Sequence, residues 1–213
     1  MTGPHQDQPL ERAGADLADA EAAMVLAHGR GATARGILDL AREIDADGVA
    51  ALAPQAANRE WYPNSFLAPV ESNQPGLRSG LQAIGDAVEV ARAAGIPHER
   101  VLVGGFSQGA CLATEWVARD ATRFGAVVAL SGGLIGDSVE RRRYGGDLDG
   151  TPVFIGCSDR DPHIPVERVN ETAHVLEDLG GDVDERIYEG MGHGVNQEEL
   201  EVVAELVAGM VRE

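Results

Sequence analysis

The stretch VLVGGFSQGACLATEWVAR, from Val101 to Arg119, decides the fold of this chain. Its first six residues are apolar or glycine and predict a buried strand, whereas Ser107 to Arg119 has the pattern of a helix. Between them, Gly105-Phe106-Ser107-Gln108-Gly109 matches G-x-S-x-G, a sharp turn that raises a serine hydroxyl above the sheet. Such a match alone also fits an ordinary glycine-rich turn, but the preceding strand and following helix favour a nucleophile.

Apolar strands and amphipathic helices alternate along the chain around this stretch. Strands are expected at 22–27, 49–53, 101–106, 126–130, 153–157 and 183–188, and helices at 33–44, 77–94, 107–119, 166–179 and 197–211. The alternation predicts an α/β fold, with one domain over residues 1–213 and a three-layer sandwich around a mainly parallel sheet of about six to seven strands. Residues 1–20 are expected to form an edge strand or a loose N-terminal arm, and residues 54–75 a long loop.

A serine hydroxyl becomes a good nucleophile only when a base removes its proton. In this architecture an acid and then a histidine follow the serine along the chain. His193, in Gly-Met-Gly-His-Gly, follows the last expected strand, and Asp159 and Asp161 both follow the fifth. We prefer Asp161 because the prolines around it stiffen its loop, whereas Asp159 is expected to cap the turn or to pair with Arg160.

An acyl-transfer site also needs backbone N–H groups that face the developing negative charge. The expected donors are Gln108, directly after the serine, and Arg30, in the glycine-rich loop after the first strand. Trp61, Tyr62 and Phe66 lie in the long loop without periodic spacing. These aromatic residues are predicted either to line an acyl pocket or to form a small apolar cluster under the loop.

The composition is acidic, and this excludes several classes of partner. Asp and Glu total 35 against 17 basic residues, all of them arginine, for a net charge of −18. Nucleic acids and anionic membranes are not expected to bind, because phosphate binding needs clustered cations. The run Arg141–Arg143 is expected to pair with nearby acids or to contact an acidic substrate. The charge indicates either a solubility adaptation or a halophilic cytoplasm near molar salt, where repulsion is screened.

No stretch has the composition of a membrane span or a signal peptide, so the sequence predicts a cytoplasmic protein without membrane insertion. Cys111 and Cys157 lie in apolar surroundings and are predicted to be buried thiols. The histidines and acids lack the spacing of a metal site, and the expected chemistry needs no cofactor. Both a monomer and a homodimer fit the sequence.

Taken in order, five pieces of the chain resemble the phospholipase/carboxylesterase family of α/β-hydrolases: His28 to Gly31, Pro54, Gly105 to Gly109, Asp161 to Pro165, and Gly192-His193. The resemblance implies an α/β-hydrolase fold without a large lid domain, and backbone donors from Arg30 and Gln108. It also implies a carboxylesterase that hydrolyses small-molecule esters with short or medium acyl chains through an acyl-enzyme. The segment Asn58 to Pro63 resembles a bacterial and archaeal branch, which argues against protein deacylation.

Two alternatives stay open. Thioester or lysophospholipid hydrolysis, or the opening of a lactone, would use the same residues on a different substrate. Dienelactone-type hydrolases typically carry cysteine as nucleophile, so Ser107 argues against that group. The alternative from another class is a non-catalytic α/β-hydrolase that serves as a binding module. Loss of Ser107, Asp161 or His193 would favour it, and all three are present.

Overall fold

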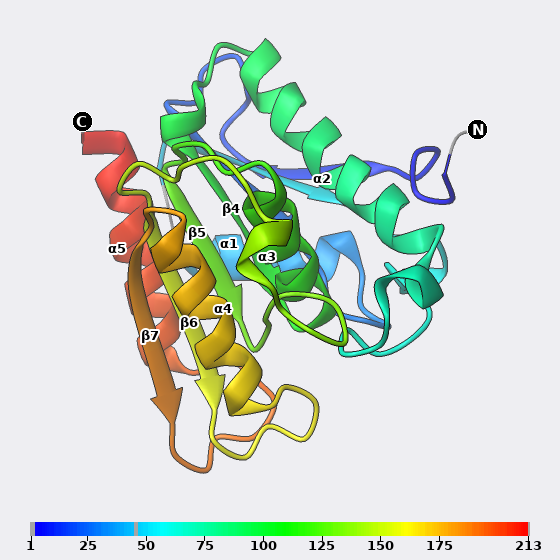
Figure 1. The fold of residues 1–213 in the computed structure, drawn as a ribbon. Helices are drawn as coiled ribbons and strands as arrows, with labels where there is room; N and C mark the ends of the chain where they lie inside the picture. The colour runs from blue at the N-terminus through cyan, green and yellow to red at the C-terminus, as the bar shows by residue number, and fades with distance from the viewer. Residues whose placement is uncertain (1–2, 45–46, 213) are drawn as a thin grey trace.

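The computed structural model describes residues 3–44 and 47–212, and within them seven strands form one sheet (Figure 1). The strand order is β1-β3-β2-β4-β5-β6-β7, and only β1 runs antiparallel to its neighbour. The strands are β1 (Leu10–Gly14), β2 (Ala22–Ala27), β3 (Val49–Pro54), β4 (Val101–Phe106), β5 (Ala126–Leu130), β6 (Pro152–Ser158) and β7 (Asp182–Tyr188). The mainly parallel sheet predicted from the sequence is therefore confirmed.

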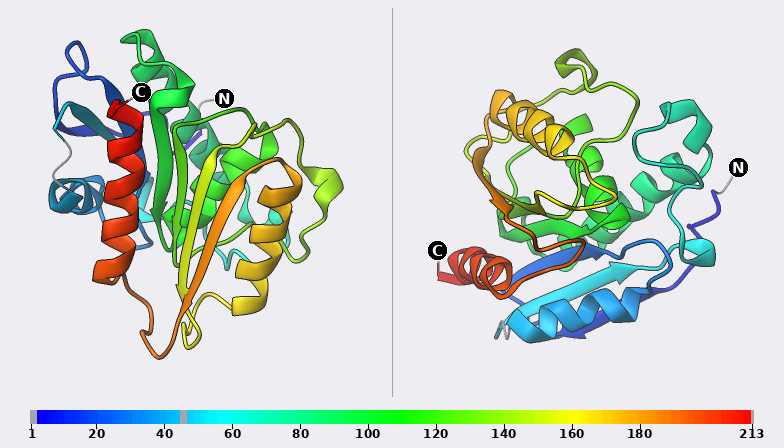
Figure 2. Two further views of the ribbon diagram at one scale, coloured as in Figure 1. Left: turned by 90° about the vertical axis from the view of Figure 1, so that its left-hand side faces the viewer. Right: turned by 90° about the horizontal axis from the view of Figure 1, so that it is seen from below.

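Helices cover both faces of the sheet. They are α1 (Ala34–Ile44), α2 (Gly76–Ala93), α3 (Gln108–Arg119), α4 (Val166–Asp178) and α5 (Gln197–Arg212). Helices α2, α3 and α4 pack on one face, and α1 and α5 on the other, as the right-hand view of Figure 2 shows. No large lid domain is inserted between these elements in the described part of the chain. Among the same residues, no helix is both long and apolar enough to span a bilayer.

Strand β2 illustrates why several strands of the sheet have continuous apolar sequences. All six of its residues are buried, because each face of the sheet is covered by helices. Val25 points into the apolar cluster beneath α2 and α3, whereas Met24 and Leu26 point into the cluster beneath α1 and α5. Side chains alternate between the two faces of a strand, so a strand between two helical layers needs apolar residues at every position.

The segments outside the regular pattern carry more structure than their sequence suggests. Near the N-terminus, Leu10–Gly14 forms β1 along the edge of β3. The expected loop at 54–75 contains two short 3₁₀ helices, η1 (Ala57–Arg59) and η2 (Val70–Asn73). A single 3₁₀ turn is too short to show a periodic pattern of apolar residues, so the sequence analysis missed both.

Candidate active site

Ser107 makes the turn between β4 and α3, because the strand ends at Phe106 and the helix begins at Gln108. Its φ of 56° and ψ of −123° lie outside the regions that a serine ordinarily adopts. Two hydrogen bonds hold this backbone. The Ser107 N–H donates to the Leu130 carbonyl at 2.9 Å, and the Cys111 N–H donates to the Ser107 carbonyl at 3.0 Å. The predicted sharp turn is therefore present and anchored on both sides.

Glycines flank the serine because the end of β2 lies against the turn. A Cβ on Gly105 would lie 2.4 Å from the Ala27 carbonyl oxygen, and one on Gly109 would lie 2.1 Å from that same oxygen. Both distances are far below a van der Waals contact, so neither position can hold a side chain without moving the backbone. The close approach of β2 also brings the Arg30 loop next to Ser107.

Three residues from distant parts of the chain form one chain of hydrogen bonds. The His193 Nε2 lies 2.9 Å from the Ser107 Oγ, and the His193 Nδ1 lies 2.7 Å from the Asp161 Oδ2. A carboxylate accepts hydrogen bonds only, so Nδ1 carries the proton, and Nε2 is left to accept from the serine hydroxyl. The structure thus brings together Ser107, His193 and Asp161 in the geometry of a nucleophile, a base and an orienting acid.

Asp161 is fixed from both of its oxygens. Its Oδ1 accepts from the backbone N–H groups of His163 at 2.8 Å and Ile164 at 3.1 Å, while Oδ2 faces His193. Burial favours a higher pKa for this carboxyl, but the hydrogen bonds from His193 and the two N–H groups outweigh burial and hold the pKa below its usual value. Asp161 is therefore an anion at neutral pH, which favours the proton on Nδ1 of His193.

The other candidate acid, Asp159, contacts the histidine loop instead of the imidazole. Its Oδ1 accepts from the Gly190 N–H at 2.7 Å. One residue earlier, the Ser158 Oγ accepts from the Gly192 N–H at 3.0 Å. These two bonds fasten the glycine-rich loop of His193 to the end of β6. Asp159 thus caps the neighbouring loop and not its own turn.

The His193 ring contacts two other rings. Phe106 lies on one side, with ring centroids 4.9 Å apart, and His163 meets it edge-on, also at 4.9 Å. His163 is not among the site residues predicted from the sequence. The signal that could have found it is its place directly after Asp161-Pro162 in the loop of the orienting acid.

A cavity of about 640 Å³ opens beside the Ser107 hydroxyl. The lining residues come mainly from the β2–α1 loop, the segment 62–66, the serine turn, and the Asp161 and His193 loops: Gly29, Arg30, Ala32, Tyr62, Pro63, Asn64, Ser65, Phe66, Phe106, Ser107, Gln108, Cys111, His163, Ile164 and His193. Two of the three aromatic residues expected at the pocket, Tyr62 and Phe66, are among them. None of the lining residues is acidic.

Trp61 lies behind this wall and not in it, which corrects the expectation that it contacts substrate. Its side chain is completely buried, and its Nε1–H donates to the His28 carbonyl at 2.8 Å. The rings of His5 and His28 pack against the indole, with ring centroids 5.3 Å and 5.1 Å from that of Trp61. An alternating or periodic pattern would have been needed to assign it to the core, and the loop has neither.

Both histidines that contact Trp61 are held neutral. The His28 Nδ1–H donates to the Gly29 carbonyl, so its Nε2 accepts from the Ala56 N–H. His5 likewise donates to the Trp61 carbonyl and accepts from a backbone N–H. Burial lowers the pKa of both side chains, because the charged form loses its hydration. This network joins the N-terminal segment, the long loop and the loop of Arg30.

Arg30 and Gln108 both line the cavity beside the serine, and each has a backbone N–H group. Among residues 3–44 and 47–212, neither N–H has a hydrogen-bond acceptor. Polar N–H groups without protein partners are available to a ligand. Both residues also use their side chains in the site, which the sequence analysis did not anticipate.

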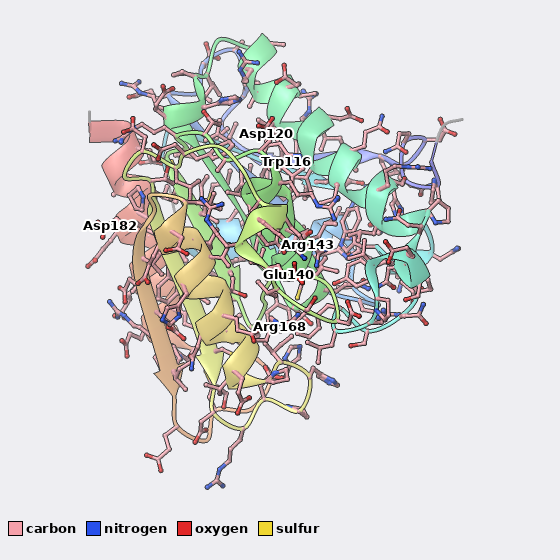
Figure 3. All side chains as sticks on the ribbon, viewed as in Figure 1. Trp116, Asp120, Glu140, Arg143, Arg168 and Asp182 are labelled. Carbon is pink, nitrogen blue, oxygen red and sulfur yellow. The ribbon has the colours of Figure 1, made fainter. Side chains whose placement is uncertain are left out.

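The two cysteines and the arginine run were also singled out by the sequence. Cys111 and Cys157 are buried and unpaired, and burial raises the pKa of each thiol to about 12. Cys111 lies at the cavity, one helical turn after Ser107. The run Arg141–Arg143 lies in the segment between β5 and β6, where Figure 3 labels Arg143. None of its three residues lines the cavity. Arg142 pairs with Glu140, and its two neighbours in the run donate to backbone carbonyls.

Comparisons with known proteins agree with this architecture. The phospholipase/carboxylesterase family model matches residues 15–210. A phospholipase/carboxylesterase from Dyadobacter fermentans superposes with a TM-score of 0.92 at 40% identity, over 98% of this chain and 100% of that chain. The esterase PE8 superposes with a TM-score of 0.76 at 22% identity, over 95% and 98% of the two chains, which is a likeness of fold.

Among curated proteins, acyl-protein thioesterase 1 from Saccharomyces cerevisiae is 30% identical over 150 residues. The match covers 70% of this chain and 64% of the yeast protein, so it spans less than two thirds of that relative. These similarities confirm the resemblance and the α/β-hydrolase fold that were expected from the motifs.

Proposed function

Because the chain belongs to the phospholipase/carboxylesterase family, we propose that it is a serine carboxylesterase acting on small-molecule esters with short or medium acyl chains. The observation that carries the proposal is the continuous hydrogen-bond chain from Ser107 through His193 to Asp161. An anionic acid, an imidazole in the correct tautomer and a hydroxyl on a strained turn are the parts that nucleophilic acyl transfer requires.

In the proposed mechanism the Ser107 Oγ attacks the ester carbonyl while its proton moves to the His193 Nε2. The carbonyl oxygen becomes an oxyanion, which accepts hydrogen bonds from the N–H groups of Arg30 and Gln108. The tetrahedral intermediate collapses, the C–O bond to the alcohol breaks, and His193 returns the proton to the leaving alcohol. Water then attacks the acyl-enzyme with the same base, and the acid product leaves Ser107 free.

The size and lining of the cavity support the proposal that the substrates are small esters with short or medium acyl chains. Tyr62, Phe66, Cys111 and Ile164 are each less than a tenth exposed and supply an apolar surface beside the serine. Apolar walls with a few polar groups are typical of small-molecule sites. The volume of about 640 Å³ is in the range of a drug-sized ligand and argues for small esters.

Thioester hydrolysis is the second candidate, and it is favoured by the similarity to an acyl-protein thioesterase. It uses the same nucleophile, base and oxyanion donors, so geometry does not separate it from ester hydrolysis. We also propose a single cytoplasmic domain. The acidic surface supports a small-molecule substrate over a polyanionic partner.

The test is covalent labelling combined with a substrate panel. Wild-type protein should react with a fluorophosphonate probe and hydrolyse nitrophenyl esters, with activity falling as the acyl chain becomes long. Ser107→Ala should lose both properties, whereas Ser138→Ala, at an exposed serine, should keep them. Wild-type protein that neither labels nor hydrolyses esters or thioesters would support a binding module. Faster hydrolysis of matched thioesters would favour the second candidate.

A further inference from the structure

The two residues beside the serine that offer free backbone N–H groups also hold one wall of the cavity with their side chains. The Gln108 side chain is buried, and its Oε1 accepts from the Trp61 N–H at 3.0 Å. Its Nε2 donates to the Tyr62 carbonyl at 2.8 Å. The side-chain amide of Gln108 therefore hydrogen-bonds to the backbone of two consecutive residues and fixes their distance from the serine turn.

The Arg30 side chain contacts the same segment. Its Nη2 donates to the carbonyls of Tyr62 and Asn64, each at 2.8 Å, and its Nη1 donates to the Pro63 carbonyl at 3.2 Å. The guanidinium also pairs with Glu60. Every acceptor of this planar group thus lies in residues 60–64, which we call the wall segment. Five donors in a rigid fork make arginine suited to such a task.

The Tyr62 carbonyl is where the two side chains meet. It accepts one hydrogen bond from Arg30 and one from Gln108, which matches the two lone pairs of a carbonyl oxygen. A further bond, from the Gly31 N–H to the Arg59 carbonyl at 2.8 Å, ties the Arg30 loop to the residue just before the wall segment. The Arg30 loop and the start of α3, which carry the two N–H donors, are therefore joined to each other through the wall segment.

We propose that Arg30 and Gln108 are positioning residues, whose side chains set the spacing of the two oxyanion N–H groups by anchoring the Arg30 loop and the start of α3 to the Tyr62 carbonyl. This inference rests on the proposed function. Oxyanion stabilisation depends on donors held at a fixed distance from the developing charge, so a small displacement of either N–H weakens the transition state more than the bound substrate. The same contacts hold the main chain of Tyr62, whose side chain lines the cavity.

Two single variants remove the anchor without removing the backbone donors. Gln108→Glu keeps an oxygen that can accept from the Trp61 N–H, but it has no donor for the Tyr62 carbonyl. Arg30→Lys keeps the positive charge for Glu60, but an ammonium has no planar fork for Tyr62 and Asn64. Arg35→Ala is the matched control, because Arg35 is exposed on α1 and pairs with Glu11 away from the cavity.

The readouts are kcat and KM for a nitrophenyl butyrate ester, and the inhibition constant of a trifluoromethyl ketone that forms a tetrahedral oxyanion adduct. Removal of a whole oxyanion donor costs roughly 100- to 1,000-fold in kcat, so a displaced donor should cost roughly 10- to 100-fold. We expect each variant to show that loss, with KM changed by less than about 3-fold and the ketone weakened in proportion to kcat/KM. Arg35→Ala should match wild type.

The double variant tests the shared anchor. Because both side chains act on one carbonyl, the loss in Gln108→Glu with Arg30→Lys should be smaller than the product of the single losses. Fully multiplicative effects would overturn the shared anchor, and so would unchanged kcat in both single variants. A fall in kcat with unchanged ketone affinity would also overturn it, since that pattern indicates a general structural effect.

Folding is checked by near-ultraviolet circular dichroism. If Gln108→Glu fails to fold, Arg30→Lys decides alone, because the Arg30 side chain is 41% exposed and its replacement leaves the core intact. Wild-type protein without esterase or thioesterase activity would overturn the proposed function together with this inference. Active wild-type protein with unaffected variants would overturn only the inference.

Discussion

Replacement of Asp161 by asparagine should abolish most of the activity while leaving the fold intact, and the reason is the direction of one hydrogen bond. The Oδ1 of Asp161 accepts from two backbone N–H groups, those of His163 and Ile164. In Asp161→Asn the side-chain oxygen must occupy this position, because an NH₂ group there would face two donors. The NH₂ group then points at the His193 Nδ1, where it can only donate.

The consequence is the wrong tautomer of the imidazole. When Nδ1 accepts from the new amide, the proton moves to Nε2, which lies 2.9 Å from the Ser107 Oγ. Nε2 then no longer has a free lone pair to accept the serine proton. A tautomer inversion of this kind lowers kcat by roughly 10⁴-fold, or ~5 kcal/mol in the activation barrier. The two backbone hydrogen bonds survive, so the melting temperature should change little.

The assay is kcat for a nitrophenyl ester, supported by the rate of fluorophosphonate labelling at Ser107. Asp159→Asn is the matched control, because an amide oxygen can still accept from the Gly190 N–H. It should stay within about 3-fold of wild type, as expected when a hydrogen-bond acceptor is conserved. If Asp161→Asn retained a tenth of the activity, or if Asp159→Asn lost as much, the assigned roles of the two acids would be refuted.

Three further predictions concern stability. Glu199 is fully buried, and burial raises its pKa from 4.5 to about 7, so its charged form destabilises the fold as pH rises through that range. Glu199→Gln should therefore be more stable than wild type near pH 8, by at most ~3 kcal/mol in urea unfolding, and no more stable near pH 4.5. The buried neutral imidazoles of His5 and His28 act in the opposite direction: their folded pKa values lie below 6.5, so stability is complete above that pH and falls below it as the unfolded chain gains protons. His5→Gln should show a smaller loss of unfolding free energy between about pH 7.5 and pH 5.5 than wild type, and an equal loss would contradict this role. Finally, sodium chloride at about 1 M should raise the melting temperature relative to about 0.05 M, since the net charge of −18 is screened; equal stability at both concentrations would remove the halophilic interpretation.

The residues of the site that could be predicted from the sequence are those that stand in a recognisable local pattern. Ser107 stands between an apolar strand and a helix, and His193 stands in a glycine-rich segment after a strand, so each carries its own signal. Asp161 was chosen over Asp159 from the prolines around it, and in the fold it is Asp161 that contacts His193. Because parallel strands end at one edge of the sheet, these separate signals already imply a common location.

What the sequence could not reveal depends on contacts between distant segments. Trp61 and Tyr62 are neighbours in a loop without periodicity. Trp61 is buried beneath the cavity wall, whereas Tyr62 lines the cavity. His5 lies in an N-terminal segment of polar composition, but its ring is buried against Trp61. From the sequence, Gln108 was assigned only a backbone N–H donor after the nucleophile. The contacts of its side chain could not be predicted, because their partners lie 46 and 47 positions earlier in the chain.

The contacts that hold the wall segment have a practical consequence for altering substrate preference. Arg30 and Gln108 hydrogen-bond to main-chain atoms of residues 61–64, so these bonds do not depend directly on the side chains at those positions. A library that randomises Asn64, which is exposed and lines the cavity, would change the shape presented to the acyl group without removing these main-chain contacts. Insertion or deletion of a single residue in the same stretch would shift every carbonyl out of reach. Composition can therefore be varied at the exposed position 64, whereas the length of the segment cannot change.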